Sequence, residues 1–347
     1  MKNLKKPLSV IAMMSMFTSC ELIADAISNQ NGISLENPTT IATNQDIKNE
    51  IQQKNVQNTN TSWFPAINLL RILGTNVEIK ANQERNQIEN HFKKVKSILQ
   101  TVKDELKDKI NENESSIKNF DETINKIMTI LNNLANATAN NNIEIGATNN
   151  IGTKAAIISN KNNVNTIINE IKNIIELAKN SNIDIEQQSI DNNPITLQNN
   201  AAALNALNGG GGRELKGGAN KGDGYALFNI VNQVNKWEII NKIIEATTDV
   251  KNDGYAHNEN NNAGQLITGK TINGAGAKSK ADIAAAIALK AMSKNGKFAG
   301  YKQNDNGGNK YTKNIQNATA NAVNKTLTAL DITIMNILNA EFAKIKK

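Results

Sequence analysis

The chain has 347 residues, of which 39% are hydrophobic and 20% charged, enough to bury a core in one large domain or two small ones. Aromatic residues make up only 4% and there are 4 prolines, which favours helices packed through aliphatic side chains. The formal net charge is +7, and it falls to +4 without the three lysines of the first six residues. This small balance, with no basic stripe interleaved with aromatics, argues against nucleic acid as a partner.

The first residues have the pattern of an export signal. Lysines form a positive start, an apolar stretch covers residues 8–17, and the small residues Thr18 and Ser19 precede Cys20. The apolar stretch is too short to span a bilayer, and no later run reaches the ~18 apolar residues that a spanning helix needs. Residues 1–19 are therefore predicted to be a signal peptide.

Cys20 is the only cysteine of the chain, so no internal disulfide can form. Directly after a short apolar leader, its natural use is diacylation of the thiol at a signal-peptidase II site. Two acyl chains on the thiol and one on the new amino terminus would hold the protein on a membrane without spanning it. The alternative is an ordinary leader followed by an incidental cysteine.

Two short segments follow the cysteine. Residues 20–60 are polar and weakly periodic, which predicts a lipidated flexible tether. A small apolar segment from Trp63 to Leu73 comes next, with Ser62 able to cap it and Gly74 at its end.

Three long segments then carry apolar side chains at the spacing of an amphipathic helix. In residues 82–111 these side chains recur at steps of four and three, from Ile88 to Ile110. Comparable stripes mark residues 115–138 and 155–180. We therefore predict three long helices with one buried side each.

The sequence changes character after these helices. Residues 191–223 contain the run Gly209–Gly212, which predicts a loop. An amphipathic helix is predicted over residues 225–248. A second loop block, 251–277, holds the asparagine-rich run 258–262.

A capping signature introduces the next helix, because Ser279 is followed three residues later by Asp282. Residues 283–289 contain no polar side chain, so we expect this helix to be apolar all round and central in the core. Asn295-Gly296 predicts its end.

The rest of the chain completes the predicted architecture. Residues 300–313 form a third loop block, and a last helix is expected over residues 314–345. No β-strand periodicity of any length is present. The prediction is an all-α fold: an elongated helical bundle with long Gly/Asn-rich surface loops, in a single domain over residues 61–347.

One octet matches the phosphate-binding pattern G-x-x-x-x-G-K-[ST], with Gly264, Gly269, Lys270 and Thr271 at the required positions. That chemistry needs a buried strand before the loop and a helix directly after it. The asparagine-rich residues before the octet and the glycine-rich residues after it cannot supply these elements. We therefore interpret the match as coincidental, and predict neither a cofactor nor catalysis.

Metal binding is also not indicated. His91 and His257 are the only histidines, and neither has metal-ligand spacing to a partner. We expect both to lie on the solvated surface, and we predict no metal site.

The segment Ala281–Ala299, with the sequence ADIAAAIALKAMSKNGKFA, closely resembles the hallmark helix of the variable large protein (variable major lipoprotein) family of Borrelia spirochaetes. The order of elements around it is also similar, with a lipoprotein leader, long helices, Gly- and Asn-rich blocks and a closing helix. The resemblance covers residues 155–347, and residues 21–150 in outline. This chain departs from the family in being rich in Asn and Ile, where members are usually rich in Ala, Gly and Lys.

The resemblance implies an outer-surface lipoprotein antigen that is held in the outer membrane by its lipid and meets host antibodies. In such a protein, blocks 191–223, 251–277 and 300–313 would be variable loops on a helical scaffold, serving antigenic variation and immune evasion. Two other functions stay open: an adhesin that binds host glycans or serum proteins through Lys270, Lys278 and Lys280, and a nucleotide-hydrolysing enzyme. The closing helix suits either packing or self-association, so a homo-oligomer also stays open.

Overall fold

The structure, a computed structural model, describes residues 78–107, 114–139, 143–149, 155–183, 197–208, 218–250, 255–256, 260–271, 276–301 and 307–345, all within one compact unit of the chain. Their helices are α4 (Asn86–Lys107), α5 (Glu114–Thr138), α6 (Lys161–Asn180), α7 (Leu197–Asn208), α8 (Asp223–Gln233), α9 (Lys236–Glu245), α10 (Ala263–Thr268), α11 (Lys280–Met292) and α12 (Gly307–Ile345). Two short strands, β1 (Tyr255–Ala256) and β2 (Lys270–Thr271), pair in parallel. The predicted all-α class is confirmed.

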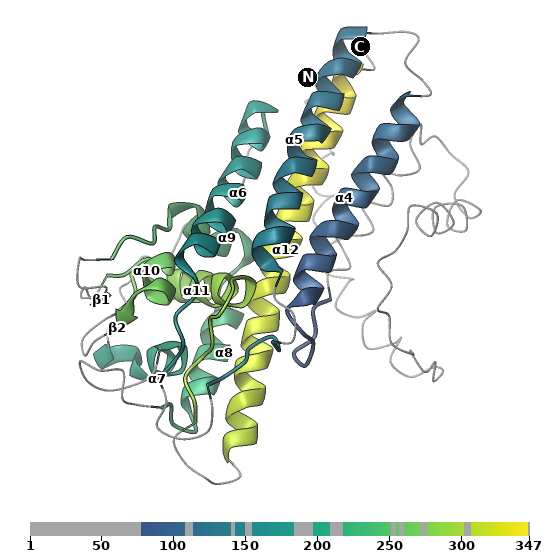
Figure 1. The fold of residues 1–347 in the computed structure, drawn as a ribbon. Coiled ribbons are helices and arrows are strands. Elements are labelled where there is room, and N and C mark those ends of the chain that lie inside the picture. Colours follow the sequence, from purple (N-terminus) through teal and green to yellow (C-terminus); the bar gives the residue numbers. More distant parts are fainter. Residues whose placement is uncertain are drawn as a thin grey trace, which may run out of the picture. The chain divides into compact units, whose positions relative to one another are not determined.

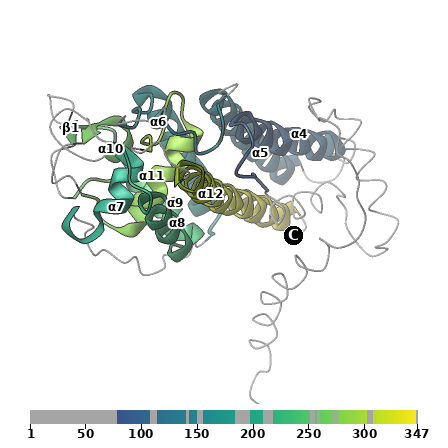
Figure 2. The same cartoon turned by 90° about the horizontal axis from the view of Figure 1, so that it is seen from below.

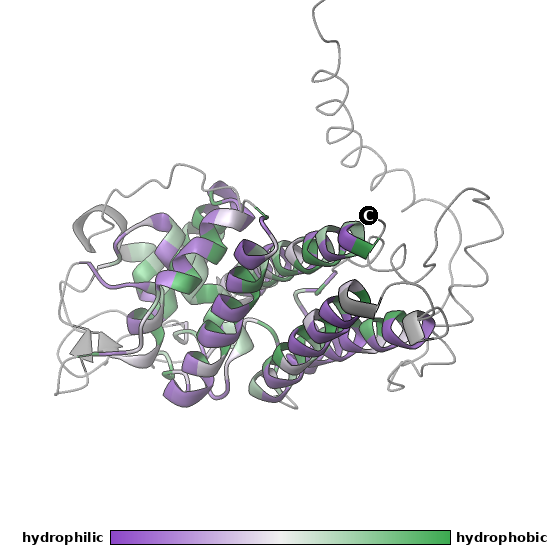
Figure 3. Ribbon diagram, turned by 90° about the horizontal axis from the view of Figure 1, so that it is seen from above, coloured by the Kyte–Doolittle hydropathy of each residue, from purple (hydrophilic) through white to green (hydrophobic). Residues whose placement is uncertain are grey.

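The amphipathic stripes of α4 and α5 face the core as predicted. Ile88, Phe92 and Leu99 of α4 are buried, as are Phe120 and Ile124 of α5. Figure 3 shows apolar and polar residues alternating along these helices. None of the described helices is long and apolar enough to cross a membrane.

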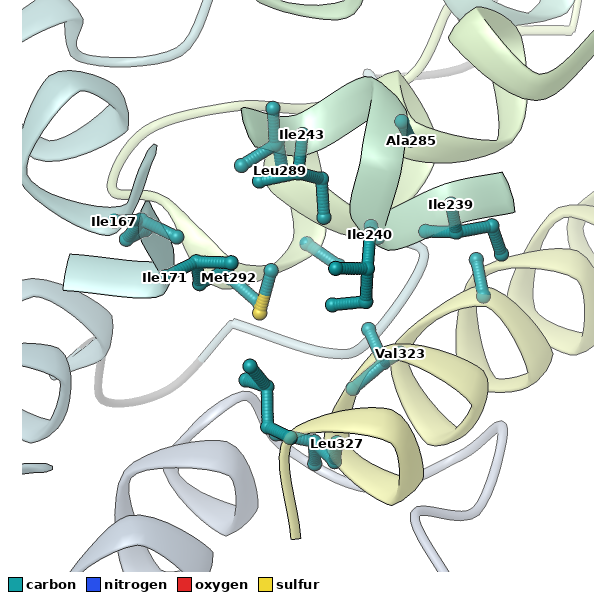
Figure 4. Packing of buried hydrophobic residues seen from close by; sticks show 14 of the residues in the cluster. Ile167, Ile171, Ile239, Ile240, Ile243, Ala285, Leu289, Met292, Val323 and Leu327 are labelled. Atoms are coloured by element: carbon teal, nitrogen blue, oxygen red, sulfur yellow. The ribbon is translucent and has the colours of Figure 1, made fainter. Parts of the chain in front are cut away.

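The longest helix, α12, packs against α5, α6, α8, α9 and α11 (Figures 1 and 2). Near its N-terminus it packs against α8, and further along Val323 lies next to Ile240 of α9 (Figure 4). Toward its C-terminus, Phe342 meets Phe120 of α5, with ring centroids 6.2 Å apart. No glycine or proline follows Gly308 in α12, so nothing in its sequence breaks the helix.

Three threonines of α12 are buried in the core although their side chains carry polar hydroxyls. Thr319, Thr326 and Thr333 are spaced seven residues apart and are all buried. Each hydroxyl donates to the backbone carbonyl four residues earlier, at 2.6, 2.9 and 2.8 Å. Because the helix's own backbone satisfies these hydroxyls, their burial leaves no polar group without a partner.

Helix α11 lies in the centre of the core, which confirms the prediction made from residues 283–289. Every residue from Ala281 to Met292 is buried, and α11 contacts α6, α8, α9, α10 and α12. Figure 4 shows Leu289 and Met292 among isoleucines of α6 and α9. Ser279 caps the helix as predicted by accepting from the Asp282 amide, while its own hydroxyl donates to Asp282 Oδ2 at 2.6 Å.

The C-terminal end of α11 is held by a buried arginine from a distant part of the chain. The Arg85 side chain is fully buried, and its guanidinium donates to the carbonyls of Lys290, Ser293 and Gly296 at 3.2, 3.0 and 2.5 Å. Helix C-termini leave carbonyls without intrahelical partners, and a cation there also complements the helix dipole. Arg85 therefore ties the start of α4 to the central helix.

A lysine does the same for α8. The Lys325 ammonium on α12 donates to the carbonyls of Val231 and Val234, both at 2.7 Å. Burial lowers the pKa of Lys325. Both helix ends are thus completed by cations from distant segments.

Asparagine side chains complete several helix N-termini. Asn160, Asn235 and Asn262 are the N-caps of α6, α9 and α10, and each side chain accepts from backbone amides of the first turn. At Asn235 and Asn262 the residue three positions on bonds back to the cap amide, which makes a full capping box. The abundant asparagine of this chain therefore has a structural use at these positions.

After α11 the chain forms what we call the hub segment, residues 297–301, because its backbone bonds to four separate segments. Phe298 N donates to Ala147 O, and Ile157 N donates to Lys297 O, both at 2.9 Å. Ala299 N donates to Ala206 O at 3.1 Å, and Ala219 N donates to Gly300 O at 2.7 Å. Phe298, Ala299 and Tyr301 are buried, so the hub segment gathers distant loops onto the core.

The prediction of one helix over residues 225–248 was wrong, because α8 ends at Gln233 and α9 begins at Lys236. Val234 is extended between them. The apolar stripe continues through the break, so periodicity could not reveal it. The interactions that fix the break are the Asn235 cap and the Lys325 bonds.

The three predicted loop blocks also contain helices, so the expectation of continuous loops was wrong. Helix α7 lies within block 191–223, α10 within block 251–277, and α12 begins at Gly307 within block 300–313. Burial overrides local Gly and Asn propensity here, since Leu204, Leu207, Leu266, Ile267 and Tyr311 are buried. Helix α11 in turn ends at Met292, before Asn295, which has a positive φ of 70°.

Candidate functional surface

The predicted lipidation site lies outside the described residues. Cys20, the signal peptide and the tether precede residue 78, where the description begins. The domain boundaries at residues 19, 20, 60 and 61 therefore stay predictions.

The octet that matches the phosphate-binding pattern forms a helix in its first part. Gly264 lies in α10 and Gly269 is its C-cap. The Gly264 and Gln265 amides donate to Asn262 Oδ1 at 3.0 and 3.1 Å, and the Gly269 amide donates to Gln265 O at 3.1 Å. A phosphate-binding loop needs such amides to point at the ligand, whereas here they bond within the helix and its cap. Lys270 and Thr271 follow in β2.

Gly264 is instead required for packing, because a Cβ there would collide with the Thr247 carbonyl oxygen. We expect Gly264→Ala to lower the free energy of unfolding by about 2 kcal/mol through overpacking. Gly222→Ala is the matched control, since a Cβ at residue 222 would meet nothing within 4 Å. Urea unfolding measures the stability of both variants. Equal losses of stability would show that the contact with Thr247 does not require a glycine at residue 264.

The histidines differ from expectation where they are described. His91 was expected on the solvated surface, and this was wrong. Its Nε2 lies 3.1 Å from Asp331 Oδ2, and the two side chains are 11% and 6% exposed. His91 thereby links α4 to α12, while His257 lies outside the described residues. In the part of the chain that is described, no group of three or more His, Cys, Asp or Glu side chains could hold a metal ion.

Part of one predicted loop block is buried. In block 251–277, the described residues Asn261, Ala263, Leu266 and Ala277 are buried. These four residues belong to the core and cannot meet an antibody, whereas Asn260 in the same block is exposed. The block's pattern of asparagine and glycine gave no sign of this burial.

Exposed residues of the other two blocks meet at one place, which we call the α8–α12 end: residues 220–222 and 309–310. Residues 220–222, just before α8, are exposed, and so are Asn309 and Lys310 in the first turn of α12. The two segments are neighbours, because a Cβ at Gly224 would lie 2.8 Å from the Tyr311 carbonyl oxygen.

The basic residues proposed for an adhesin are only partly available. Lys278 is exposed. The Lys280 ammonium donates to Gln233 Oε1 at 2.9 Å. The side chain of Lys270 lies outside the described part of the chain.

A polar groove of about 490 Å³ lies between α5 and α6. Asn125, Thr129 and Asn133 line one side, and Glu170 and Asn173 line the other. Asn133 Nδ2 and Asn173 Nδ2 donate to the two carboxylate oxygens of Glu170, at 2.8 and 3.1 Å. The Asn133 bond crosses the groove, and the Asn173 bond lies within α6.

Comparison with known families identifies the family of this chain. The family model described as Borrelia lipoprotein matches residues 69–347, most of the chain. The chain belongs to this Borrelia lipoprotein family. The resemblance first seen in residues 281–299 is therefore confirmed, and the segment forms the centre of the fold.

Two curated relatives are similar in sequence to this Borrelia lipoprotein. It is 33% identical to Variable large protein 14 of Borrelia hermsii over 294 residues, covering 79% of this chain and 76% of the relative. It is 32% identical to Variable large protein 12 of the same species over 296 residues, covering 79% and 74%.

A solved structure shares the fold. The crystal structure of the Lyme disease variable surface antigen VlsE of Borrelia burgdorferi superposes with a TM-score of 0.63 at 23% sequence identity, covering 80% of this chain and 96% of that one. The helical fold of this Borrelia lipoprotein is therefore that of a known surface antigen.

Proposed function

We propose that the protein is an outer-membrane surface antigen, anchored by lipid at Cys20, that takes part in antigenic variation and does not catalyse a reaction. The observation that carries this is the family match over residues 69–347, together with a leader that ends at the single cysteine. The curated relatives are named as variable large proteins, and the structural neighbour as a variable surface antigen.

The fold supports this role by separating framework from surface. Helix α11 and the hub segment are buried, so changes there would damage the core. Surface substitutions away from such features usually change stability by less than about 0.5 kcal/mol. We infer that variation is tolerated at the α8–α12 end, where residues 220–222 and 309–310 are exposed.

The anchor is tested by labelling cells with palmitate and treating intact cells with proteinase K. We expect wild-type protein to take up label and to be lost to external protease, whereas Cys20→Ala takes up none. Cys20→Ser, which keeps a polar side chain of similar size, should also take up no label, because a hydroxyl cannot form the thioether. Label in either variant, or full protection of the wild type, would contradict the proposal.

The adhesin function is the second candidate, and its support is the exposed Lys278 beside Lys280 at the start of α11. Retention of the protein on heparin with a steep salt dependence, lost on replacing Lys270, Lys278 and Lys280 with glutamine, would favour it. Elution of the wild type and the triple variant at the same salt concentration would favour an antigen without this activity.

A further inference from the structure

Two cations lie buried at the same helix end. Arg85 and Lys290 are 0% and 1% exposed, and the Arg85 guanidinium donates to the Lys290 carbonyl at 3.2 Å. The Lys290 ammonium lies 5.8 Å from the centre of the Phe298 ring. Neither cation has a carboxylate partner among the described residues. Isolated buried charges are costly. Three carbonyls accept from the Arg85 guanidinium, but the second cation, Lys290, has no negatively charged group beside it among the described residues.

Two polar atoms at the same place lack hydrogen-bond partners. They are Arg85 Nε and Ser159 Oγ, both buried. Gly296 is the neighbour that they share: its carbonyl accepts from Arg85 Nη2 at 2.5 Å, and a Cβ built on it would touch Ser159 Oγ. The same Cβ would lie 2.9 Å from Lys290 Cγ. An arginine, a lysine and a serine thus surround one glycine.

The donor set has the character of an anion site. Arg85 Nε, the Lys290 ammonium and the Ser159 hydroxyl can all donate hydrogen bonds, and two of them carry positive charge. Buried groups without partners in a native protein call for an ion or an ordered water that satisfies them. From this cluster we propose that Arg85, Lys290 and Ser159 bind one small monatomic anion, chloride, at the C-terminal end of α11.

The choice of a monatomic anion follows from the surroundings. Arg85, Ser159 and Lys290 are buried, and so is Phe298 beside the Lys290 ammonium, so the site lies away from solvent. Gly296 is needed at this position because any side chain there would meet Ser159 and Lys290. The contacts around Gly296 are tight, and chloride is smaller than phosphate or a carboxylate.

The test is urea unfolding of the full chain at pH 6 and constant ionic strength, with sodium gluconate replaced stepwise by sodium chloride. A ligand that binds only the folded state multiplies the folding equilibrium constant by one plus the ratio of its concentration to its dissociation constant. For a dissociation constant of about 30 mM, 300 mM chloride raises the equilibrium constant about tenfold. A wild type without chloride dependence would overturn the proposal.

Matched variants separate the site from general salt effects. We expect the chloride dependence to vanish in Lys290→Met and in Ser159→Ala, which remove donors without adding volume. Lys325→Met is the control, because Lys325 also holds a helix end but gives its ammonium to two carbonyls, and it should keep the wild-type response. The same chloride response in all four proteins would refute a site at α11.

A direct readout is available in crystals grown in sodium bromide. Bromide scatters anomalously and substitutes for chloride, so an anomalous peak within hydrogen-bond distance of Arg85 Nε and Ser159 Oγ is expected. A peak absent from the wild type, or present unchanged in Lys290→Met, would contradict the assignment.

Discussion

Arg85→Met is expected to lower the free energy of unfolding by about 3 kcal/mol or more. The variant keeps much of the aliphatic volume but removes the guanidinium that satisfies the carbonyls of Lys290, Ser293 and Gly296. A buried acceptor left without a partner costs about 1–3 kcal/mol, and three are affected here. The variant also no longer has the desolvation cost of a buried arginine charge, and this offsets part of the loss of stability. Equilibrium unfolding in urea, followed by circular dichroism, measures the change.

Two further variants define the cause. Arg85→Lys keeps a positive charge but not the planar fork, so it should recover only part of the lost stability. Lys325→Met removes the bonds to two carbonyls at a half-buried position, and we expect a loss of about 1–2 kcal/mol. An Arg85→Met variant as stable as the wild type would show that the end of α11 does not depend on this cation.

Lys290→Met is expected to stabilise the protein, with a gain that depends on pH. Burial, and secondarily the charge of Arg85, lowers the pKa of Lys290 from 10.5 to about 7 in the folded protein. Replacing a buried charge with an apolar side chain of similar length is expected to add about 1–4 kcal/mol to stability below pH 7. Urea unfolding in chloride-free buffers at pH 6, 8 and 9.5 compares the two proteins.

The sign of the pH dependence follows from proton binding. Between pH 7 and 10.5 the unfolded chain holds the Lys290 proton while the folded protein has lost it, so wild-type stability rises with pH through this window. The variant lacks this contribution, and its advantage should therefore shrink above pH 7 and disappear by about pH 10.5. A constant difference at all three pH values would mean that Lys290 stays charged in the fold.

Sequence patterns predicted the elements whose burial is periodic. The stripes of α4 and α5 and the apolar run of residues 283–289 each lie on the core side that the spacing indicated. These predictions succeeded because an apolar stripe along a long helix can be buried only when that side of the helix faces the core. The same pattern could not show the break at Val234, since apolar residues continue on both sides of it.

The long-range polar contacts were not predictable from local spacing. Arg85 is 205 residues from Lys290, and His91 is 240 residues from Asp331. The sequence did contain one sign that Arg85 has a special role. Only three of the 39 basic residues are arginine, and the others are lysine. The buried helix α10 was missed because its six residues are too short to show a helical period and lie among asparagines and glycines.

The hub segment also determines the order in which the protein can fold. Residues 297–301 hold backbone partners from segments near residues 147, 157, 206 and 219, so these earlier parts cannot complete their bonds until the ribosome has made most of the chain. Native pairs so distant in sequence raise the contact order, which slows folding because loop closure precedes the stabilising contacts. If the leader directs export as proposed, we expect a precursor that folds late to reach the export machinery unfolded and to pass through a narrow channel before its core closes.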